Sequence, residues 1–225
     1  MPSTTAAGPA PEAAPAPSLP PPLAPTPLGR PVIDLHVGEP PPVVARQFHL
    51  HDGFYLRAAV GLVTARTFVT SDALAHPSYS VSGGGLGLDL LVGGTPSVGL
   101  ALGGGLSLQS FGQGGGSSSA GLGLLGVFVD GFPMANKGLH LGGMLGLAAS
   151  RTSRRGGVDE LRGGGLGMSA WLGHDWWVAD VWSMGGLLRF SGALAKDGSH
   201  DKGPAPYALE SSSYELGLLF SVLYH

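Results

Sequence analysis

Cysteine is absent from the 225-residue sequence. The chain therefore has neither a disulfide framework nor a thiolate metal site. Charge is scarce too, because Asp, Glu, Lys and Arg make up 12% of the residues, about half of the share that is usual in soluble domains. A formal net charge of −3 provides no basic surface for nucleic acid. Something other than bulk water must cover much of the folded surface.

The amino-terminal residues lack the features of a secretory signal. The first basic residue is Arg30, and prolines interrupt every apolar stretch before it, so the charged start and the apolar core of a signal are both missing. Fourteen of the 19 prolines lie at or before Pro42. We predict that residues 1–48 form a disordered Pro/Ala-rich linker and residues 49–225 the folded domain, with any export signal removed or encoded upstream.

From Gly53 onward, apolar residues fall on every second position, which is the period of a β-strand. Eight such runs alternate with polar connections. In the first run the apolar face carries Phe54, Leu56, Ala58, Val60 and Leu62. The fourth run is less regular, and we place Leu122, Leu124 and Phe128 on its apolar face. Over the runs as a whole, the opposite face is mainly glycine and serine, with single polar groups.

A face of small residues suits the interior of a narrow closed barrel, where curvature crowds side chains. The apolar face then points outward, which is stable only in lipid, and lipid requires a closed sheet. The pattern predicts an all-β fold: an eight-stranded antiparallel up-and-down transmembrane β-barrel after the Pro-rich segment. Strands of about ten residues would join through tight turns at one end and long polar loops at the other.

Four charged residues within the runs share the glycine face: Arg57, Asp89, Arg189 and Glu215. On the lipid face each charge would cost ~2–4 kcal/mol at the bilayer midplane. In the lumen, two cations and two anions can neutralise one another. We predict an internal polar network of these four residues, joined by Gln109 and His140. Trp171 also falls on this face, where it would fill the bore, stack on an arginine or mark a bulge.

Aromatic residues collect at the ends of the runs, where amphipathic rings form girdles at the lipid headgroups. Ordinary strand propensity is the alternative explanation. The predicted girdle near the tight turns comprises Phe54, Phe132, Trp176, Trp177, Trp182 and Tyr224, and the one near the long loops comprises Tyr79, Phe111 and Tyr214.

The eight runs, the opening "GFYLR" after a proline-rich leader, and a last strand that alternates up to Tyr224 resemble the small outer-membrane β-barrels of Gram-negative bacteria. The pattern is similar to that of the OmpA transmembrane domain and of OmpX, and it covers Gly53 to His225. The resemblance implies an outer-membrane location with residues 1–48 in the periplasm, and contact with outer-membrane lipids and lipopolysaccharide. It also implies insertion by the barrel-assembly machinery. His225 departs from the family, which usually ends on the aromatic residue itself.

The predicted function is that of a monomeric, non-enzymatic barrel without cofactor, with a structural or surface-interaction role. Arg151, Arg154 and Arg155 would lie in an outer loop and either contact lipopolysaccharide phosphate or remain solvated. The alternatives are a narrow conduit for small or apolar solutes and an enzyme that modifies lipid A.

Three other patterns carry less weight. Gly121, Gly123 and Gly126 match the dinucleotide fingerprint but lack the flanking strand and helix. His49 and His51 could hold a metal with a third ligand such as Asp52, or mark the entry to the first strand. The apolar segment between Asp89 and Asp130 is long enough for a membrane helix, although glycine at such density is a poor helix former.

Overall fold

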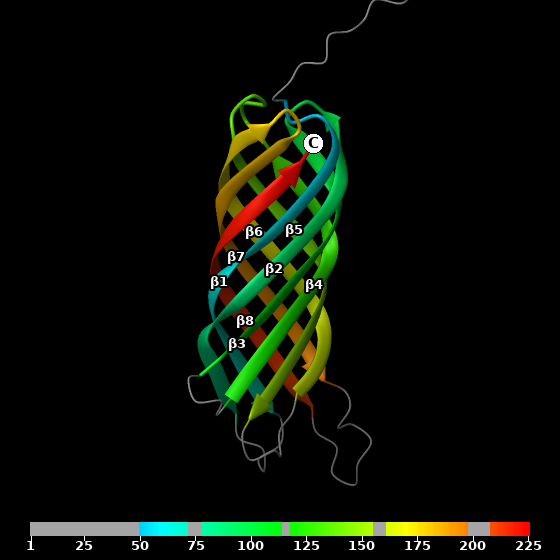
Figure 1. Ribbon diagram of the computed structural model, residues 1–225. Coiled ribbons are helices and arrows are strands. Elements are labelled where there is room, and N and C mark those ends of the chain that lie inside the picture. Colours follow the sequence, from blue (N-terminus) through cyan, green and yellow to red (C-terminus); the bar gives the residue numbers. More distant parts are fainter. Residues whose placement is uncertain (1–49, 72–77, 114–117, 155–160, 198–207) are drawn as a thin grey trace, which may run out of the picture. The chain divides into compact units, whose positions relative to one another are not determined.

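The computed structural model describes residues 50–71, 78–113, 118–154, 161–197 and 208–225 (Figure 1). The predicted linker, residues 1–48, lies outside the described residues, as do His49 and Arg155.

The described residues form eight strands. These are β1 (Gly53–Ser71), β2 (Tyr79–Ser97), β3 (Leu100–Gly112), β4 (Ser118–Gly131), β5 (Leu139–Arg154), β6 (Leu161–Ala179), β7 (Trp182–Asp197) and β8 (Leu209–Tyr224). Each strand pairs antiparallel with the next, and β8 pairs with β1 to close the barrel (Figure 1). The predicted eight-stranded up-and-down barrel is confirmed.

None of the described residues belongs to a helix that is long and apolar enough to cross a membrane. The segment from Asp89 to Asp130, considered above as a helix, forms the end of β2, all of β3 and most of β4. The helical alternative is therefore wrong. The same observation excludes the dinucleotide-binding interpretation, because Gly121, Gly123 and Gly126 all lie within β4 and not in a turn before a helix.

The strands are steeply inclined to the barrel axis. The stagger of the sheet is found by moving from each residue to its register partner on the next strand. A path that starts at Arg162 of β6 and passes to Arg151 of β5 goes once around the barrel and returns to β6 at Leu172, ten residues beyond its start. A stagger that exceeds the number of strands tilts them strongly. As a result, residues that lie at the same height along the barrel axis can be far apart in strand register.

The two ends of the barrel differ. At one end, here called the turn end, lie the start of β1, the connections β2–β3, β4–β5 and β6–β7, and His225. Gly99 in the β2–β3 turn has a φ of +79°, a conformation that favours glycine. The opposite end, here called the loop end, carries the connections that lie partly outside the described residues.

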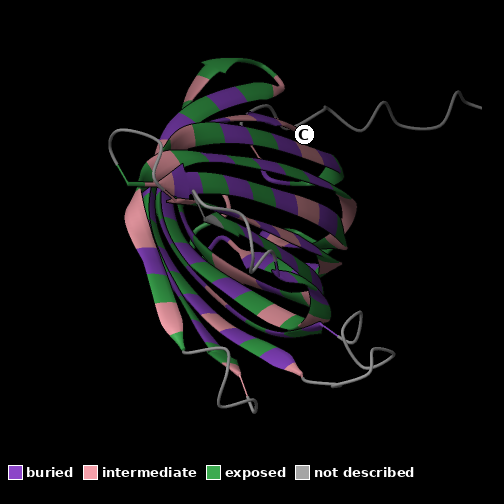
Figure 2. Ribbon diagram, turned by 90° about the horizontal axis from the view of Figure 1, so that it is seen from below, coloured by how far each residue is buried: buried purple, intermediate pink, exposed green. Residues whose placement is uncertain are grey.

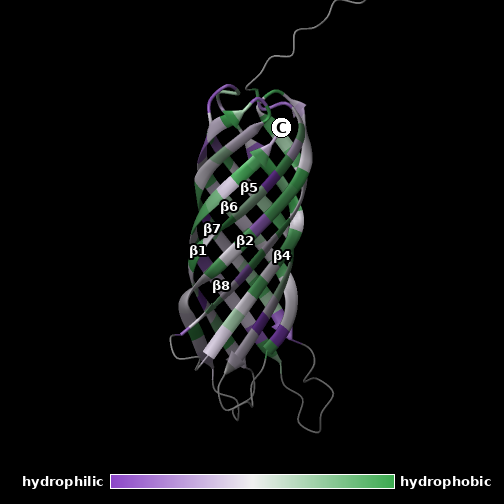
Figure 3. Ribbon diagram, viewed as in Figure 1, coloured by the Kyte–Doolittle hydropathy of each residue, from purple (hydrophilic) through white to green (hydrophobic). Residues whose placement is uncertain are grey.

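The strands are longer than the ten residues expected, at 13 to 19 residues each. At the turn end, β2 and β6 extend to Ser97 and Ala179. At the loop end, the polar segments "RTFVTS" and "RTSR", which belong to the predicted connections, continue β1 and β5. There the outward residues become polar, for example Thr64, Arg66 and Ser82. The sheet therefore continues beyond the apolar band that surrounds its other part (Figure 3).

Buried and exposed residues alternate along the strands (Figure 2), as expected when successive side chains point into the lumen and to the exterior. The outward leucines are strongly exposed, for example Leu62 at 70% and Leu218 at 68%. An apolar exterior of this kind is stable against lipid. Inside the loop end, Val69, Leu161 and Leu209 form one apolar cluster. A second apolar cluster, around Val81 and Phe111, fills the lumen near it.

The orientation predicted for the fourth run is wrong. Leu122, Leu124 and Phe128 are buried inside the barrel, whereas Leu125 and Val127 are exposed on its exterior. Two adjacent leucines, at 124 and 125, make either orientation compatible with an apolar outer face. Asp130 decides between the two orientations. It lies on the same face of β4 as Leu122, Leu124 and Phe128, and if that face pointed outward its carboxylate would contact lipid.

Candidate functional site within the lumen

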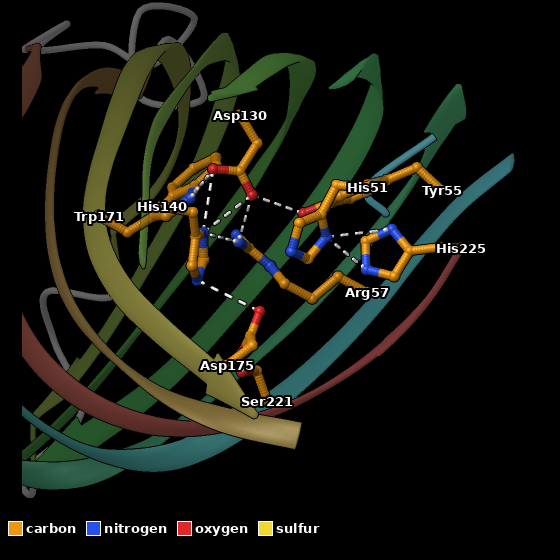
Figure 4. Close-up of polar contacts among 9 residues, drawn as sticks. All are labelled: His51, Tyr55, Arg57, Asp130, His140, Trp171, Asp175, Ser221 and His225. Atoms are coloured by element: carbon orange, nitrogen blue, oxygen red, sulfur yellow. Dashed lines mark hydrogen bonds and ion pairs between the residues drawn. The ribbon is translucent and has the colours of Figure 1, made fainter. Parts of the chain in front are cut away.

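Apart from Asp197 near the loop end, which accepts a hydrogen bond from the Arg162 amide, the buried charged residues of the strands form two clusters rather than the single network predicted. The central cluster consists of Arg189, Asp89, Glu215 and Ser107, with Gln109 at its edge. The turn-side cluster consists of Arg57, Asp130, His140, Tyr55 and Trp171, with Asp175 and Ser221 beside it (Figure 4).

The central cluster is organised around the guanidinium of Arg189, which is fully buried. Its Nη1 donates hydrogen bonds to the carboxylate of Asp89 and, at 2.9 Å, to Ser107 Oγ. Its Nη2 donates to Glu215 Oε1 at 2.9 Å. Gln109 reaches the cluster only through Ser107, at 3.5 Å. One arginine thus joins strands β2, β3, β7 and β8 across the bore.

The turn-side cluster is organised around the carboxylate of Asp130. Its Oδ2 accepts hydrogen bonds from Arg57 Nη1 at 2.8 Å and from the Tyr55 hydroxyl at 2.6 Å. Its Oδ1 accepts one from Trp171 Nε1 at 3.0 Å, and His140 Nδ1 lies 3.1 Å from each oxygen. Four side chains from β1, β5 and β6 therefore converge on one residue of β4.

Of the three alternatives considered for Trp171, the structure shows that it fills the bore and stacks on an arginine. The Cζ atom of Arg57 lies 4.4 Å from the centroid of its indole, a favourable cation–π geometry. Gly142 makes room for the indole, because a Cβ atom there would lie 2.6 Å from the ring. The small residues of the luminal face thus serve the packing of the few large ones.

His140 lies between two carboxylates. Its Nε2 is 3.5 Å from Asp175 Oδ2, and Ser221 donates a hydrogen bond to the other Asp175 oxygen at 2.9 Å. The serine therefore contacts a carboxylate and not the imidazole, so the nucleophile–base contact of a Ser-His-Asp site is not formed here. Ser221 and His140 are both completely buried, which further separates them from any substrate.

The structure brings Asp89, Arg189 and Glu215 together, with Gln109 adjacent, but places Arg57 and His140 in the other cluster. Sequence reasoning missed Asp130 and Asp175, which are the anionic partners of Arg57 and His140. Neither was included in the predicted polar network. The alternation of inward and outward residues could have identified Asp175 as luminal, because Asp175 and Trp171 are an even number of residues apart and both lie in the lumen.

The residues of the predicted girdles fall into two groups, one on the exterior of the barrel and one in its interior. Phe54, Trp176 and Trp182 are exposed on the exterior at the turn end, where Tyr224 contacts Phe54 and Trp182 with centroids 6.1 and 5.0 Å apart, and Tyr214 is exposed nearer the loop end. The other four belong to the interior: Phe111 and Phe132 are buried, the Tyr79 hydroxyl bonds Thr152 Oγ1, and Trp177 contacts His51. The girdle prediction is wrong for these four because they share the phase of luminal residues.

Four rings cover the lumen at the turn end, and we call them the aromatic lid: His51, Phe132, Trp177 and His225. His51 stacks on Phe132 with centroids 3.6 Å apart, and its Nδ1 lies 2.8 Å from His225 Nε2, a hydrogen bond. The main chain anchors the lid, since the His225 amide donates to Val181 and the Gly99 amide to His51. Within the described part of the chain, no three metal-ligating side chains converge, so His51 and Asp52 have no third ligand there.

The two lid histidines are neutral at ordinary pH. Burial lowers the pKa of His51 from 6.5 to about 3, and the neighbouring His225 and His140 lower it further, although Asp130 opposes this. Burial likewise lowers the pKa of His225 to about 4. A proton on either ring would be both desolvated and close to a second imidazole.

We expect the barrel to lose stability as the pH falls from 6.5 toward 4. In this range the unfolded chain binds protons at His51 and His225 while the folded chain does not, so the free energy of unfolding decreases. The slope is about 1.4 kcal/mol per pH unit for each imidazole. Above pH 6.5 the contribution is constant. Urea titrations at several pH values measure the slope.

The matched variants are His51→Gln with His225→Gln, which removes the lid pair, and His174→Gln, which removes an exposed histidine. The first should show a shallower slope than the unmodified barrel and the second an unchanged one. Equal slopes in all three proteins would contradict the assignment of neutral lid histidines.

No family model and no curated protein sequence matches this chain. Solved structures with a similar architecture include the outer membrane protein OprG from Pseudomonas aeruginosa, with 12% identity, a TM-score of 0.45, and coverage of 80% of this chain and 100% of that chain. The attachment invasion locus protein Ail of Yersinia pestis has 12% identity and a TM-score of 0.42 over 76% and 99% of the two chains.

The outer membrane protease OmpT from Escherichia coli is also similar, with 8% identity and a TM-score of 0.42 over 79% of this chain and 98% of that chain. These proteins share a barrel architecture with the chain. Its function depends on the residues inside its own lumen and on its own exterior.

Proposed function

We propose that the chain is an integral outer-membrane barrel with a closed, side-chain-filled lumen and a structural or surface-interaction role without catalysis. The central cluster carries this proposal: a buried arginine of β7 bonds carboxylates of β2 and β8 across the bore. The turn-side cluster and the aromatic lid obstruct the lumen toward one end. Apolar clusters around Leu161 and Phe111 fill it toward the other.

The same arrangement argues against the two alternatives. A conduit needs a continuous path, whereas salt-bridged and apolar layers follow one another along this lumen. A lipid A enzyme needs an accessible nucleophile or base, and His140 and Ser221 are fully buried. An eight-stranded bore is in any case only wide enough for its own side chains.

We expect the protein, refolded and inserted into planar lipid bilayers, to produce no steady ion conductance. Insertion is verified independently by heat-modifiable gel migration of the same preparation, and a large-bore porin in the same bilayers shows that channels are detectable. Steady unitary channels would overturn the filled lumen and favour the conduit. A changed lipid A mass in cells that produce the protein would overturn the non-catalytic role.

A further inference from the structure

Two histidines of the aromatic lid face each other through their ring nitrogens (Figure 4). His51 Nδ1 lies 2.8 Å from His225 Nε2 and 3.4 Å from His225 Nδ1. His51 is completely buried and His225 is 8% exposed. At neutral pH both imidazoles are uncharged, so each has one N–H group and one nitrogen lone pair. The pair therefore has two lone pairs that can be directed at the same point.

The spacing of these nitrogens is close to that of two imidazoles bound to one metal ion. With metal–nitrogen bonds of about 2.0 Å, the two nitrogens lie about 3.3 Å apart at a tetrahedral angle and about 4 Å apart in a linear complex. The rings of the lid would have to separate by roughly 1 Å to reach the linear arrangement. The N–H group that now joins the rings would lie on the other nitrogen of its ring, so no proton is released.

His225 can make this movement. Among the described residues its side chain forms hydrogen bonds only with His51. Its ring contacts those of Tyr55, Phe132 and Trp177 with centroids 5.1 to 6.1 Å apart. A small rotation of the His225 ring therefore separates the nitrogens without breaking another hydrogen bond.

The surroundings favour an ion with a single positive charge. The cost of removing an ion from water grows with the square of its charge, so it is about four times as large for a divalent ion as for a monovalent ion of equal size. The Trp177 ring lies 4.9 and 5.1 Å from the two imidazoles, and Phe132 stacks on His51. An ion between the histidines would thus be next to aromatic rings, whose faces attract cations.

The number of available ligands indicates the same kind of ion. In the part of the chain that the structure describes, no three metal-ligating side chains converge, whereas Zn²⁺ takes four ligands in structural sites. Imidazole is a good ligand for copper, and monovalent copper and silver, which have filled d shells, form stable complexes with two ligands. Two neutral histidines are therefore a complete ligand set for such an ion.

We propose that His51 and His225 form a two-coordinate site for a soft monovalent metal ion, Cu⁺ in the cell, with the indole of Trp177 beside it. A bound ion would join the segment before β1 to the residue after β8 and so strengthen the closure of the barrel. The site differs from the one considered from the sequence, because the second ligand is His225 and not His49 or Asp52. It does not depend on whether the lumen conducts.

The test uses Ag⁺ as the probe, because this ion is stable in air and silver nuclei have spin one half. The refolded full chain, labelled with ¹⁵N-histidine, is titrated with Ag⁺ in excess free imidazole, which displaces ions held by single exposed histidines. Native mass spectra should show one Ag⁺ per barrel. In NMR spectra, the bound silver should split the ¹⁵N signals of two imidazoles, those of His51 and His225.

The variant His51→Gln with His225→Gln assigns these signals and should bind Ag⁺ at least about a hundredfold more weakly, since loss of one outer partner of a ligand already weakens metal binding about 10–100-fold. Two matched controls should bind Ag⁺ as the unmodified protein does. His174→Gln removes an exposed histidine of β6, and Met134→Leu removes an exposed thioether at the turn end. Heat-modifiable migration verifies that each variant is folded.

Three results would overturn the site: no retention of Ag⁺ by the unmodified protein, equal retention by the lid variant, or splitting at other imidazoles. Retention of Zn²⁺ as tightly as Ag⁺ would overturn the assignment to a soft monovalent ion. The splitting is measured on the unmodified protein, so it decides the question even if the lid variant does not fold. Channel activity would refute the closed lumen without affecting the metal result.

Discussion

Replacing Arg189 by methionine should lower the free energy of unfolding by about 3–5 kcal/mol, the usual cost of removing one partner from a buried charge cluster. Methionine has a similar length but cannot neutralise Asp89 or Glu215. Both carboxylates are buried and would be left without their cation. Urea unfolding in phospholipid vesicles, followed by tryptophan fluorescence and gel migration, measures the loss.

A compensating variant separates charge from packing. Adding Asp89→Asn and Glu215→Gln to Arg189→Met removes the stranded charges while keeping the side-chain shapes nearly constant. We expect this triple variant to recover at least half of the lost stability. If Arg189→Met alone costs less than about 1 kcal/mol, the value typical of solvated ion pairs, water must reach the central cluster and the lumen is not closed there.

Placing an arginine on the outward face of β8 should have the second largest effect. Leu218 is 68% exposed in the middle of the apolar band, and Leu62 and Leu188 are its register partners. If this face meets hydrocarbon, Leu218→Arg should cost about 2–4 kcal/mol, as arginine does near the bilayer midplane. In a water-exposed face the same change would be nearly neutral. The measurement is again urea unfolding in vesicles.

Ser212→Arg provides the depth control, because Ser212 lies on the same outward face of β8 near the loop end. Arginine costs only about 0–1 kcal/mol near the membrane interface, so the two variants should differ clearly. Equal costs at both positions would contradict the position of the apolar band. A larger cost at Ser212 would mean that the band lies toward the loop end.

Local periodicity is sufficient to predict the architecture of this protein. Alternation of leucine with glycine determines the strand type, the number of runs determines the strand number, and the placement of Arg57, Asp89, Arg189 and Glu215 determines which face is inside. The same rule also assigns Phe111 to the lumen, since it shares the phase of Gln109. The girdle prediction failed there because an aromatic near a strand end was weighed above its phase.

Which charges meet across the bore could not be predicted in the same way. Arg57 of β1 bonds Asp130 of β4, although these strands are not neighbours in the sheet. Their equal level depends on the ten-residue stagger, and the stagger is a property of the closed sheet as a whole. No local pattern encodes it, so the sequence identified luminal residues without identifying their partners.

The aromatic lid has a consequence for the order of assembly. Its rings come from the segment before β1, the β4–β5 turn, the end of β6 and the residue after β8, so they converge only once β1 and β8 have paired. Individual hairpins that enter the bilayer earlier cannot build it. The indole of Trp177 lies against the imidazoles of His51 and His225. Its fluorescence should therefore report the last step of assembly, the closure of the barrel.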